Sequence, residues 1–331
     1  MLKRSSFLLL LLFGTYTAYG QLLEWKVGAF GFADNREYVK AGLYSQSILG
    51  IRMAPEVGIL LDSTHRLRAG IDFLQEFGAK PFGAKVLPIV YYQYQHAGLS
   101  FFIGAFPRVH LKGDYPKALL NDTLLYDRPN MEGLFFQYRS HSFHEQVWVD
   151  WTSRQTHEQR EQFMVGLSGK IAWNSFFLTH ALTMLHTANT LDGDYPVRDN
   201  AAGLLQLGID LNQSMGLDSL TVAAGVLASL DRIRGVYGAR TPKGFIAEVK
   251  AAYKAWFVHD TFYKGQAHHI IFGDRFYTKD TYNRLDLGWK PFNKGHVEGS
   301  FVFSLHFTPG QISNQQMIQL RYRFGQSLAL N

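Results

Sequence analysis

The sequence contains no cysteine, and after residue 20 it contains no uninterrupted apolar run long enough to cross a membrane as a helix. Without cysteine there are no disulfide bonds to stabilise an exported fold, so its stability must come from another source. Without a membrane helix, any residence in a membrane must be through strands or through surface attachment. The sequence also has no linker rich in proline, glycine or serine and no shift in composition, and we therefore expect one domain over residues 21–331.

The first 20 residues differ from the rest of the chain. Lys3 and Arg4 precede an apolar run over 7–13, and small residues stand at positions 18 and 20. This pattern predicts a cleaved secretory signal peptide over residues 1–20, because the apolar run is well short of the roughly 20 residues that a membrane span needs. Loss of Lys3 and Arg4 lowers the formal net charge by two, from +6 to +4, which is too small a charge to indicate nucleic-acid binding.

Two-faced segments recur along the remainder of the chain. In 66–73, 204–212 and 318–324, apolar residues alternate with polar or small ones at a spacing of two, whereas an amphipathic helix would space them three and four apart. Such segments recur at intervals of roughly 20 residues, often with an aromatic ring at one end, as in a sheet rolled up with its apolar face toward lipid. The high aromatic content, 15%, suits the interface belts of such a barrel. We therefore predict an all-β, transmembrane, antiparallel up-and-down β-barrel of about 16 strands, with 14 as the alternative.

Some segments are harder to interpret. Pro55 and Glu56 indicate a break or bulge in the second strand, and the segment 256–263 predicts only a short strand. The two rows of 176–187 are mixed, so its faces are not assigned. The longest irregular segment, about 107–130, is expected to be extracellular or to fold into the barrel mouth, because long loops of barrels face outside.

The last strand adds a family resemblance. Ile318 and Leu320 alternate with polar residues and lead to the aromatic pair Tyr322 and Phe324. This segment resembles the closing strand of porin-like Gram-negative outer-membrane barrels, although it has no central glycine and the chain continues to Asn331. The resemblance implies a location in the bacterial outer membrane, contact with outer-membrane lipid, and recognition of the last strand by the barrel-assembly machinery.

The polar row of each strand should face the lumen. An arginine or lysine facing lipid at mid-bilayer costs about 2–4 kcal/mol, so inward placement is strongly favoured. The predicted pore-lining residues are Arg66, Arg68, Asp72, Trp148, Asp150, Lys170, Asp210, Glu248, Lys250, Arg284, Asp286, Lys290, Arg321 and Arg323.

A barrel of about 16 strands is wide enough for an aqueous channel. We therefore predict a porin-like channel for passive diffusion of small hydrophilic solutes, with a bias toward anions because basic residues outnumber acids in the inward row. The alternative is a non-conducting barrel that serves as a structural, secretion or polysaccharide-export component. A third class is a soluble exported β-protein, such as a carbohydrate-binding sandwich. By analogy with porins of this size, a homo-oligomer is also expected.

Catalytic patterns are weak, and we predict no enzyme activity and no cofactor, with an outer-membrane lipid hydrolase as the alternative. None of the 13 histidines has a serine two positions later, the spacing of outer-membrane phospholipases. Glu145 with Asp150, or Asp286 with Glu298, could act as a general acid and base, but carboxylates lining a wet lumen are the favoured interpretation. No metal site is expected, since extended neighbours such as His268 and His269 face opposite ways and other histidines stand apart. For example, His180 and His186 share a strand face but lie about 20 Å apart.

Overall fold

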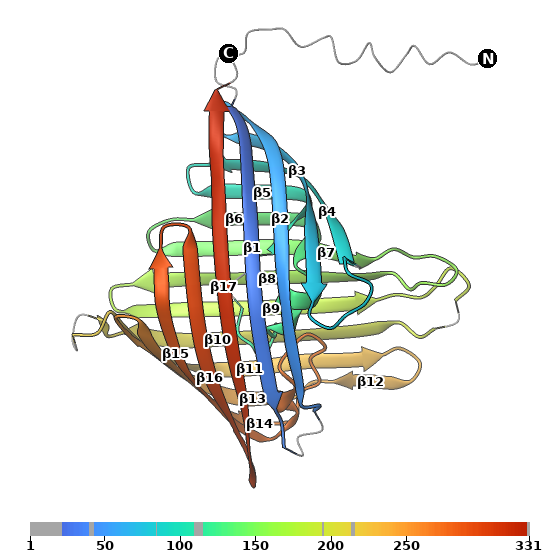
Figure 1. Ribbon diagram of the computed structural model, residues 1–331. Helices are drawn as coiled ribbons and strands as arrows, with labels where there is room; N and C mark the ends of the chain where they lie inside the picture. The colour runs from blue at the N-terminus through green and yellow to red at the C-terminus, as the bar shows by residue number, and fades with distance from the viewer. Residues whose placement is uncertain are drawn as a thin grey trace.

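A computed structural model describes residues 22–39, 43–83, 85–108, 115–193, 195–212 and 216–329. The predicted signal peptide lies outside these residues. The described chain is almost entirely antiparallel sheet (Figure 1). Its strands are β1 (Leu22–Glu37), β2 (Gln46–Leu61), β3 (His65–Glu76), β4 (Lys85–His96), β5 (Leu99–Pro107), β6 (Asn130–Arg139), β7 (Phe143–Ser153), β8 (Gln162–Trp173), β9 (Phe176–Thr187), β10 (Arg198–Asp210), β11 (Ser219–Ile233), β12 (Tyr237–Arg240), β13 (Lys243–Tyr253), β14 (Trp256–Gly265), β15 (Thr281–Lys294), β16 (Val297–Thr308) and β17 (Gln311–Ala329).

The sheet closes on itself, because β1 pairs with β17 on one side and with β2 on the other. The short β12 and the longer β13 both pair with β11, so they are two parts of one interrupted strand. The interruption falls at Thr241 and Pro242, and proline cannot donate a hydrogen bond to a sheet. With β12 and β13 counted as one strand, the barrel has 16 strands among the described residues, which confirms the predicted fold and strand number.

The two ends of the barrel differ. At one end lie both ends of the sheet, Leu22 and Ala329, together with the tight connections 62–64, 97–98, 140–142 and 174–175. The other end has the longer connections, including 108–129, 154–161, 188–197 and 266–280. Because bacterial barrels have short periplasmic turns and long extracellular loops, we describe the first as the periplasmic end and the second as the extracellular end.

Two strands differ from the sequence expectation. The break predicted at Pro55 and Glu56 is wrong, since β2 runs unbroken through both residues. Pro55 interrupts only the pairing with β3, between Met53 and Glu56, while the pairing with β1 continues. The segment predicted to be short extends to Gly265.

The apolar rows face outward. Leu67 on β3 and Leu207 on β10 are 54% and 55% exposed, while the alternating residues of the same strands are buried or face the lumen. Aromatic side chains gather near both edges of this surface, with Trp256 stacked on Trp289 at the periplasmic edge and Trp151 stacked on Phe163 at the extracellular edge. The surface is therefore a lipid-facing wall with aromatic belts.

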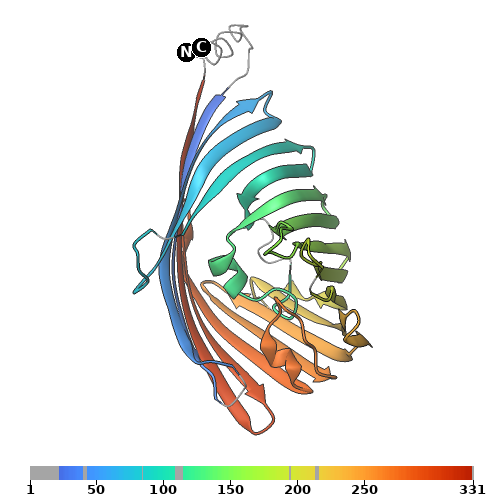
Figure 2. The same ribbon diagram turned by 90° about the vertical axis from the view of Figure 1, so that its right-hand side faces the viewer.

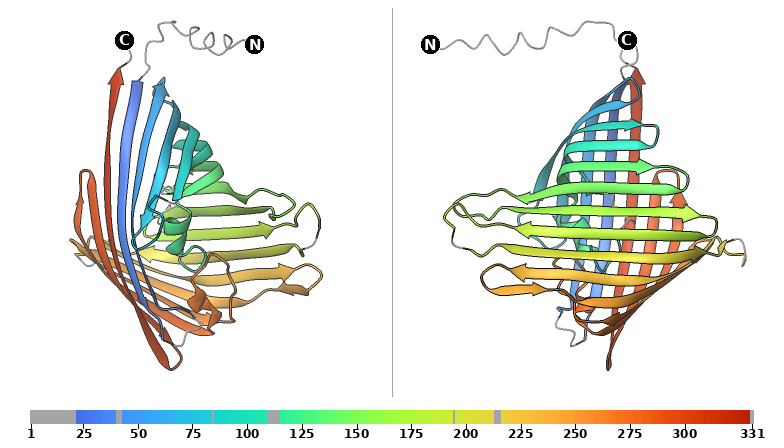
Figure 3. Two further views of the ribbon diagram at one scale, coloured as in Figure 1. Left: turned by 45° about the vertical axis from the view of Figure 1, so that its right-hand side comes forward. Right: turned by 180° about the vertical axis from the view of Figure 1, so that it is seen from behind.

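Two extracellular segments fold into the lumen, and together we call residues 115–129 and 266–280 the plug. The first contains the helix α1 (Thr123–Asp127) and the second the 3₁₀ helix η3 (Arg275–Thr278), and both lie inside the ring of strands (Figures 2 and 3). The segments are joined by hydrogen bonds from the Asn121 N–H to the Phe272 carbonyl, 2.7 Å, and from the Asp274 N–H to the Lys117 carbonyl, 2.8 Å. Within the described residues, no helix has the length and apolar character to cross a membrane.

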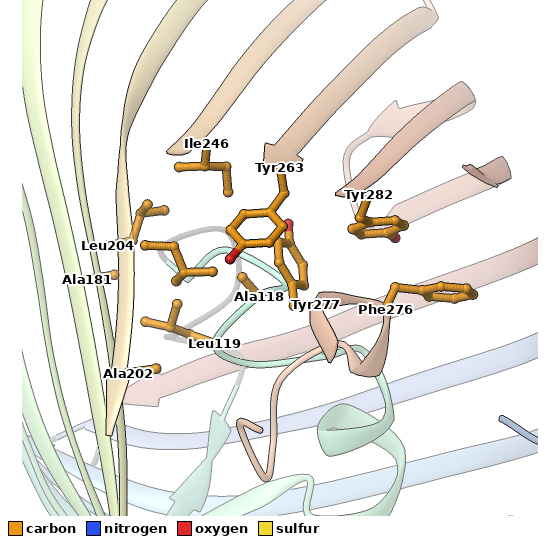
Figure 4. Packing of buried hydrophobic residues seen from close by; sticks show 11 residues of the cluster. Ala118, Leu119, Ala181, Ala202, Leu204, Ile246, Tyr263, Phe276, Tyr277 and Tyr282 are labelled. Carbon is orange, nitrogen blue, oxygen red and sulfur yellow. The ribbon is translucent and has the colours of Figure 1, made fainter. Parts of the chain in front are cut away.

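The plug is held by apolar packing against the inner wall. Leu119 and Tyr277 of the plug are buried against the wall residues Leu204, Ile246 and Tyr263 (Figure 4). A second cluster surrounds Phe106 and Trp148, and in a third Tyr126 stacks on Phe32 with ring centroids 4.5 Å apart. The extracellular half of the lumen is therefore filled with side chains.

Candidate functional site

Several predicted pore-lining residues are bound to partners in the wall or the plug. Arg66 and Arg68 both contact the carboxylate of Glu24, and Asp72 pairs with Arg52. On β7, Asp150 accepts a hydrogen bond from Arg108, and the indole of Trp148 donates to the Tyr115 hydroxyl, 2.9 Å away. These residues face inward, and their contacts brace the wall and anchor the plug.

The remaining members of the predicted row lie nearer to open space. A cavity of about 670 Å³, which we call the chamber, lies between the plug and the periplasmic end of the lumen. A smaller cavity of about 260 Å³ lies beside β17, β1 and β2 and is lined by Arg321 and Arg323. Asp210 accepts a hydrogen bond from the Asn212 N–H at the strand end. The predicted residues that line the chamber are Lys170, Glu248, Lys250, Arg284, Asp286 and Lys290.

A buried polar cluster lies where the plug meets the chamber. Arg284 contacts Asp286 at 2.7 Å and Asp274 at 3.4 Å, so its charge is shared between the wall and the plug. In the plug, Lys117 contacts Asp122 at 2.7 Å. Burial by itself would raise the pKa of Asp122, but Lys117 and Arg284 together lower that pKa below its ordinary value. Asp122 is therefore ionised, and each acid of this cluster contacts a cation.

The outer wall carries a different polar cluster at its extracellular edge, which we call the outer-wall site. On β9, Leu185 faces the lumen, and His186 faces outward in the same row as the exposed Leu182. His186 Nδ1 lies 2.8 Å from Asp199 Oδ1 on β10, and Arg234, in the turn after β11, lies 3.0 Å from Asp199 Oδ2. The imidazole also packs against Phe163 with ring centroids 5.1 Å apart.

This arrangement has the geometry of a general base. A carboxylate that accepts a hydrogen bond from the Nδ1–H group fixes the tautomer in which Nε2 carries the lone pair. Among the described residues no hydrogen bond is made to Nε2 of His186, and the ring is partly exposed on the lipid-facing wall. Arg234 supplies a positive charge beside the pair. The site can therefore activate a water molecule for attack on an ester at the membrane surface.

A second histidine contact lies inside the wall. Ser229 Oγ on β11 lies 2.7 Å from Nδ1 of His268 in the plug. The sequence does not predict this contact, because the two residues are 39 positions apart. Burial, and His269 beside it, lower the pKa of His268 to about 4. No carboxylate among the described residues orients this imidazole, and only 1% of His268 is exposed. The pair therefore anchors the plug to β11.

The acid and base pairs considered from the sequence do not form. Glu145 faces outward, where His180 lies 3.1 Å from it, whereas Asp150 on the same strand faces the lumen. Asp286 pairs with Arg284, while Glu298 pairs with Arg323 at 3.0 Å. Among the described residues, no group of three His, Asp or Glu side chains is arranged to hold a metal ion.

The outer-wall site could be found only in part from the sequence. The alternation of 176–187 places His186 on one face of a strand. Because the rows on both faces are mixed, the sequence does not show which face points outward. Asp199 comes from β10 and Arg234 from the turn after β11, and their positions relative to His186 emerge only from the paired sheet. A polar residue in an otherwise apolar outward row is the signal that could have drawn attention to the site.

The fold and its two-faced wall define a porin-like outer-membrane barrel. Within that class, a family model described as lipid A 3'-O-deacylase-type matches residues 16–330, so the chain belongs to this family. A comparison with curated protein sequences finds no match.

Solved structures share the fold at low identity. A loop-deletion mutant of OmpT, an outer membrane protein of Vibrio cholerae, is 8% identical with a TM-score of 0.58, and the match covers 92% of this chain and 100% of that one. OpdL of Pseudomonas aeruginosa is 10% identical with a TM-score of 0.55, and the match covers 93% of this chain and 99% of that one. These likenesses concern the fold alone.

Proposed function

We propose that this protein is an outer-membrane hydrolase that removes an ester-linked acyl chain from lipid A, with the outer-wall site as its reaction centre. The observation that carries the proposal is the His186–Asp199 pair on the lipid-facing wall at the extracellular edge. The family to which the chain belongs supports lipid A as the substrate and the 3'-O ester as the bond that is cleaved. A lipid in the outer leaflet reaches this wall by diffusing in the membrane plane.

The reaction consumes one water molecule and needs no other reactant. Nε2 of His186 takes a proton from the water as its oxygen bonds to the ester carbonyl carbon. The positive charge of Arg234 stabilises the oxyanion that forms. The bond between that carbon and the sugar oxygen then breaks, and the proton passes from His186 to the departing oxygen. The products are a free fatty acid and a lipid with one more hydroxyl group.

The surroundings of the site suit a lipid substrate. Trp151 and Phe163 stack at 5.0 Å beside His186 and offer apolar surface to acyl chains. Arg232, an exposed outward-facing neighbour in the strand paired with Asp199, adds a second positive charge at headgroup level. A phosphorylated headgroup would be attracted to this edge.

Lipid A in mixed micelles with the purified protein provides the test, with acyl release followed by mass spectrometry. His186→Gln is expected to lower the rate about 10²-fold or more, because no general base remains, and Asp199→Asn to lower it because the tautomer is no longer fixed. His157→Gln is the matched control, since His157 pairs with Asp192 at 2.9 Å in exposed extracellular loops and is not part of the outer-wall site. Equal activity of the His186 and His157 variants would reject the outer-wall site, and an inactive wild type would reject the hydrolase.

A passive channel is the second candidate function. The porin-type fold and the chamber of about 670 Å³ support it. The filled extracellular half of the lumen favours a non-conducting barrel, which is why we place the hydrolase first. Current across a planar bilayer separates the two candidates.

A further inference from the structure

We propose that the chamber is a binding site for a small polyanion that enters from the periplasmic end of the barrel. This site lies inside the lumen, apart from the outer-wall site, and the inference does not depend on the hydrolase or on passage of a solute across the membrane. Its evidence is an imbalance of charge in the chamber wall.

Two lysines of the chamber have no acidic partner. Lys170 lies over the ring of Phe177, with Nζ 4.4 Å from the ring centroid, and Lys290 lies over the ring of Phe257 at 4.8 Å. Among the described residues, neither ammonium group has a carboxylate within 4 Å. Aromatic faces hold a cation in place without neutralising its charge. Both positive charges therefore remain available to a ligand.

Each acid of the chamber already has a cationic partner. Glu248 lies 2.8 Å from Lys250 and 3.8 Å from His259. At the plug, Asp122 is paired with Lys117, and Arg284 serves both Asp274 and Asp286. Since Asp274 and Asp286 share Arg284, one negative charge is set against the two positive charges of Lys170 and Lys290, so the net charge of these groups is positive. A low-dielectric wall strengthens the attraction of this charge for anions.

A neutral donor also lines the chamber. Gln206 on β10 is 6% exposed, and its Nε2 has no hydrogen-bond partner among the described residues. A buried N–H group without a partner is costly, and an acceptor oxygen of a ligand would satisfy it. This observation is independent of the lysines and also indicates an anionic or acceptor-rich ligand.

The positions of the chamber lysines indicate how many charges the ligand carries and from which side it enters. Lys170, Lys250 and Lys290 lie on β8, β13 and β15, so they reach the chamber from different parts of the wall. A ligand that meets more than one of them must carry several negative groups. The plug covers the extracellular side, and the three lysines lie toward the periplasmic ends of their strands. Phosphate and carboxylate groups both fit this chemistry.

Isothermal titration of the full-length barrel in nonionic detergent tests the site, with pyrophosphate and citrate as probes. We expect wild-type protein to bind at least one probe, and the double variant K170Q/K290Q to bind it at least 10-fold more weakly. K254Q is the matched control, because Lys254 also lies over an aromatic ring, that of Tyr253 at 5.0 Å, at the periplasmic end but does not line the chamber. It should bind like wild type.

The outcomes separate the sources of the ligand. Binding of pyrophosphate alone supports a phosphorylated ligand, binding of citrate alone supports a polycarboxylate, and binding of both supports recognition by charge. The proposal is overturned if wild type binds neither probe, if K170Q/K290Q retains wild-type affinity, or if K254Q loses as much affinity as the double variant. None of these results bears on acyl release, so failure of the chamber and failure of the hydrolase are distinguishable.

Discussion

Single residues set the role of each histidine in this barrel through their neighbours. His186 has a carboxylate on Nδ1 and a partly exposed Nε2, the arrangement of a base that can accept a proton. His268 has a hydroxyl on Nδ1 and a ring enclosed by the plug and the wall, so protonation would place a charge in a buried site. Similar side chains at similar heights in the barrel are thus suited to catalysis in one case and to anchoring in the other.

The lowered pKa of His268 makes the stability of the plug depend on pH. In the unfolded chain this imidazole titrates near its ordinary value of about 6.5, whereas its pKa in the folded protein is about 4. Between pH 4 and pH 6.5 the unfolded state therefore binds one more proton at this imidazole than the folded state does. The stabilisation that His268 contributes to the folded state is present above about pH 6.5 and is lost as the pH falls toward 4. We expect urea unfolding, followed by tryptophan fluorescence, to show wild type losing about 1–3 kcal/mol more than His268→Gln between pH 7 and pH 4.5. Parallel losses in the two proteins would contradict the buried neutral imidazole.

Among the elements, the first plug segment depends on a buried ion pair between the end of β5 and β7. Arg108 follows β5, contacts Asp150 on β7, and also donates to the backbone carbonyl groups of Arg128, 2.9 Å, and Asn130, 3.2 Å. Both members of the pair are 1% exposed. The pair therefore holds the C-terminal end of the first plug segment and the end of β5 against the wall.

Removing one member of this pair should be costly. Asp150→Ala leaves the Arg108 charge buried without its partner, and we expect about 3–5 kcal/mol less unfolding free energy in urea. The double variant R108M/D150L should lose much less, because no buried charge remains. Glu298→Ala is the control, since it breaks an exposed pair with Arg323 that contributes about 0–1 kcal/mol. A loss for Asp150→Ala no larger than for Glu298→Ala would show that the pair does not anchor the plug.

Most elements could be predicted from the sequence because lipid and water impose a period of two on every strand. Segments such as 66–73 and 204–212 have clean rows, and the structure places them as predicted. The predicted break at Pro55 is wrong because a strand inside a sheet pairs on two sides. Pro55 removes a hydrogen bond toward β3, but the hydrogen bonds to β1 keep the strand continuous. In 176–187 the outward row includes His180 and His186, so composition alone could not assign its direction.

For the whole molecule, repeated local patterns predict the barrel class and the number of strands. They do not predict which segments fill the lumen. The plug is joined to the wall by contacts between residues far apart in sequence, such as Asn121 with Phe272. No local pattern indicates which loops fold inward, and the same applies to the partners of Lys170 and His186. The signal peptide and recognition of the last strand by the assembly machinery stay predictions.

In the proposed hydrolase, the reaction takes place at the lipid-facing wall while the plug keeps the lumen shut. The most direct test is the current across a planar bilayer that contains refolded wild-type protein from a preparation shown to release acyl chains from lipid A. We expect no stable current steps above the bare bilayer, because buried side chains fill the extracellular half of the lumen. Reproducible steps whose size rises with salt concentration would contradict the claim and would favour the passive channel.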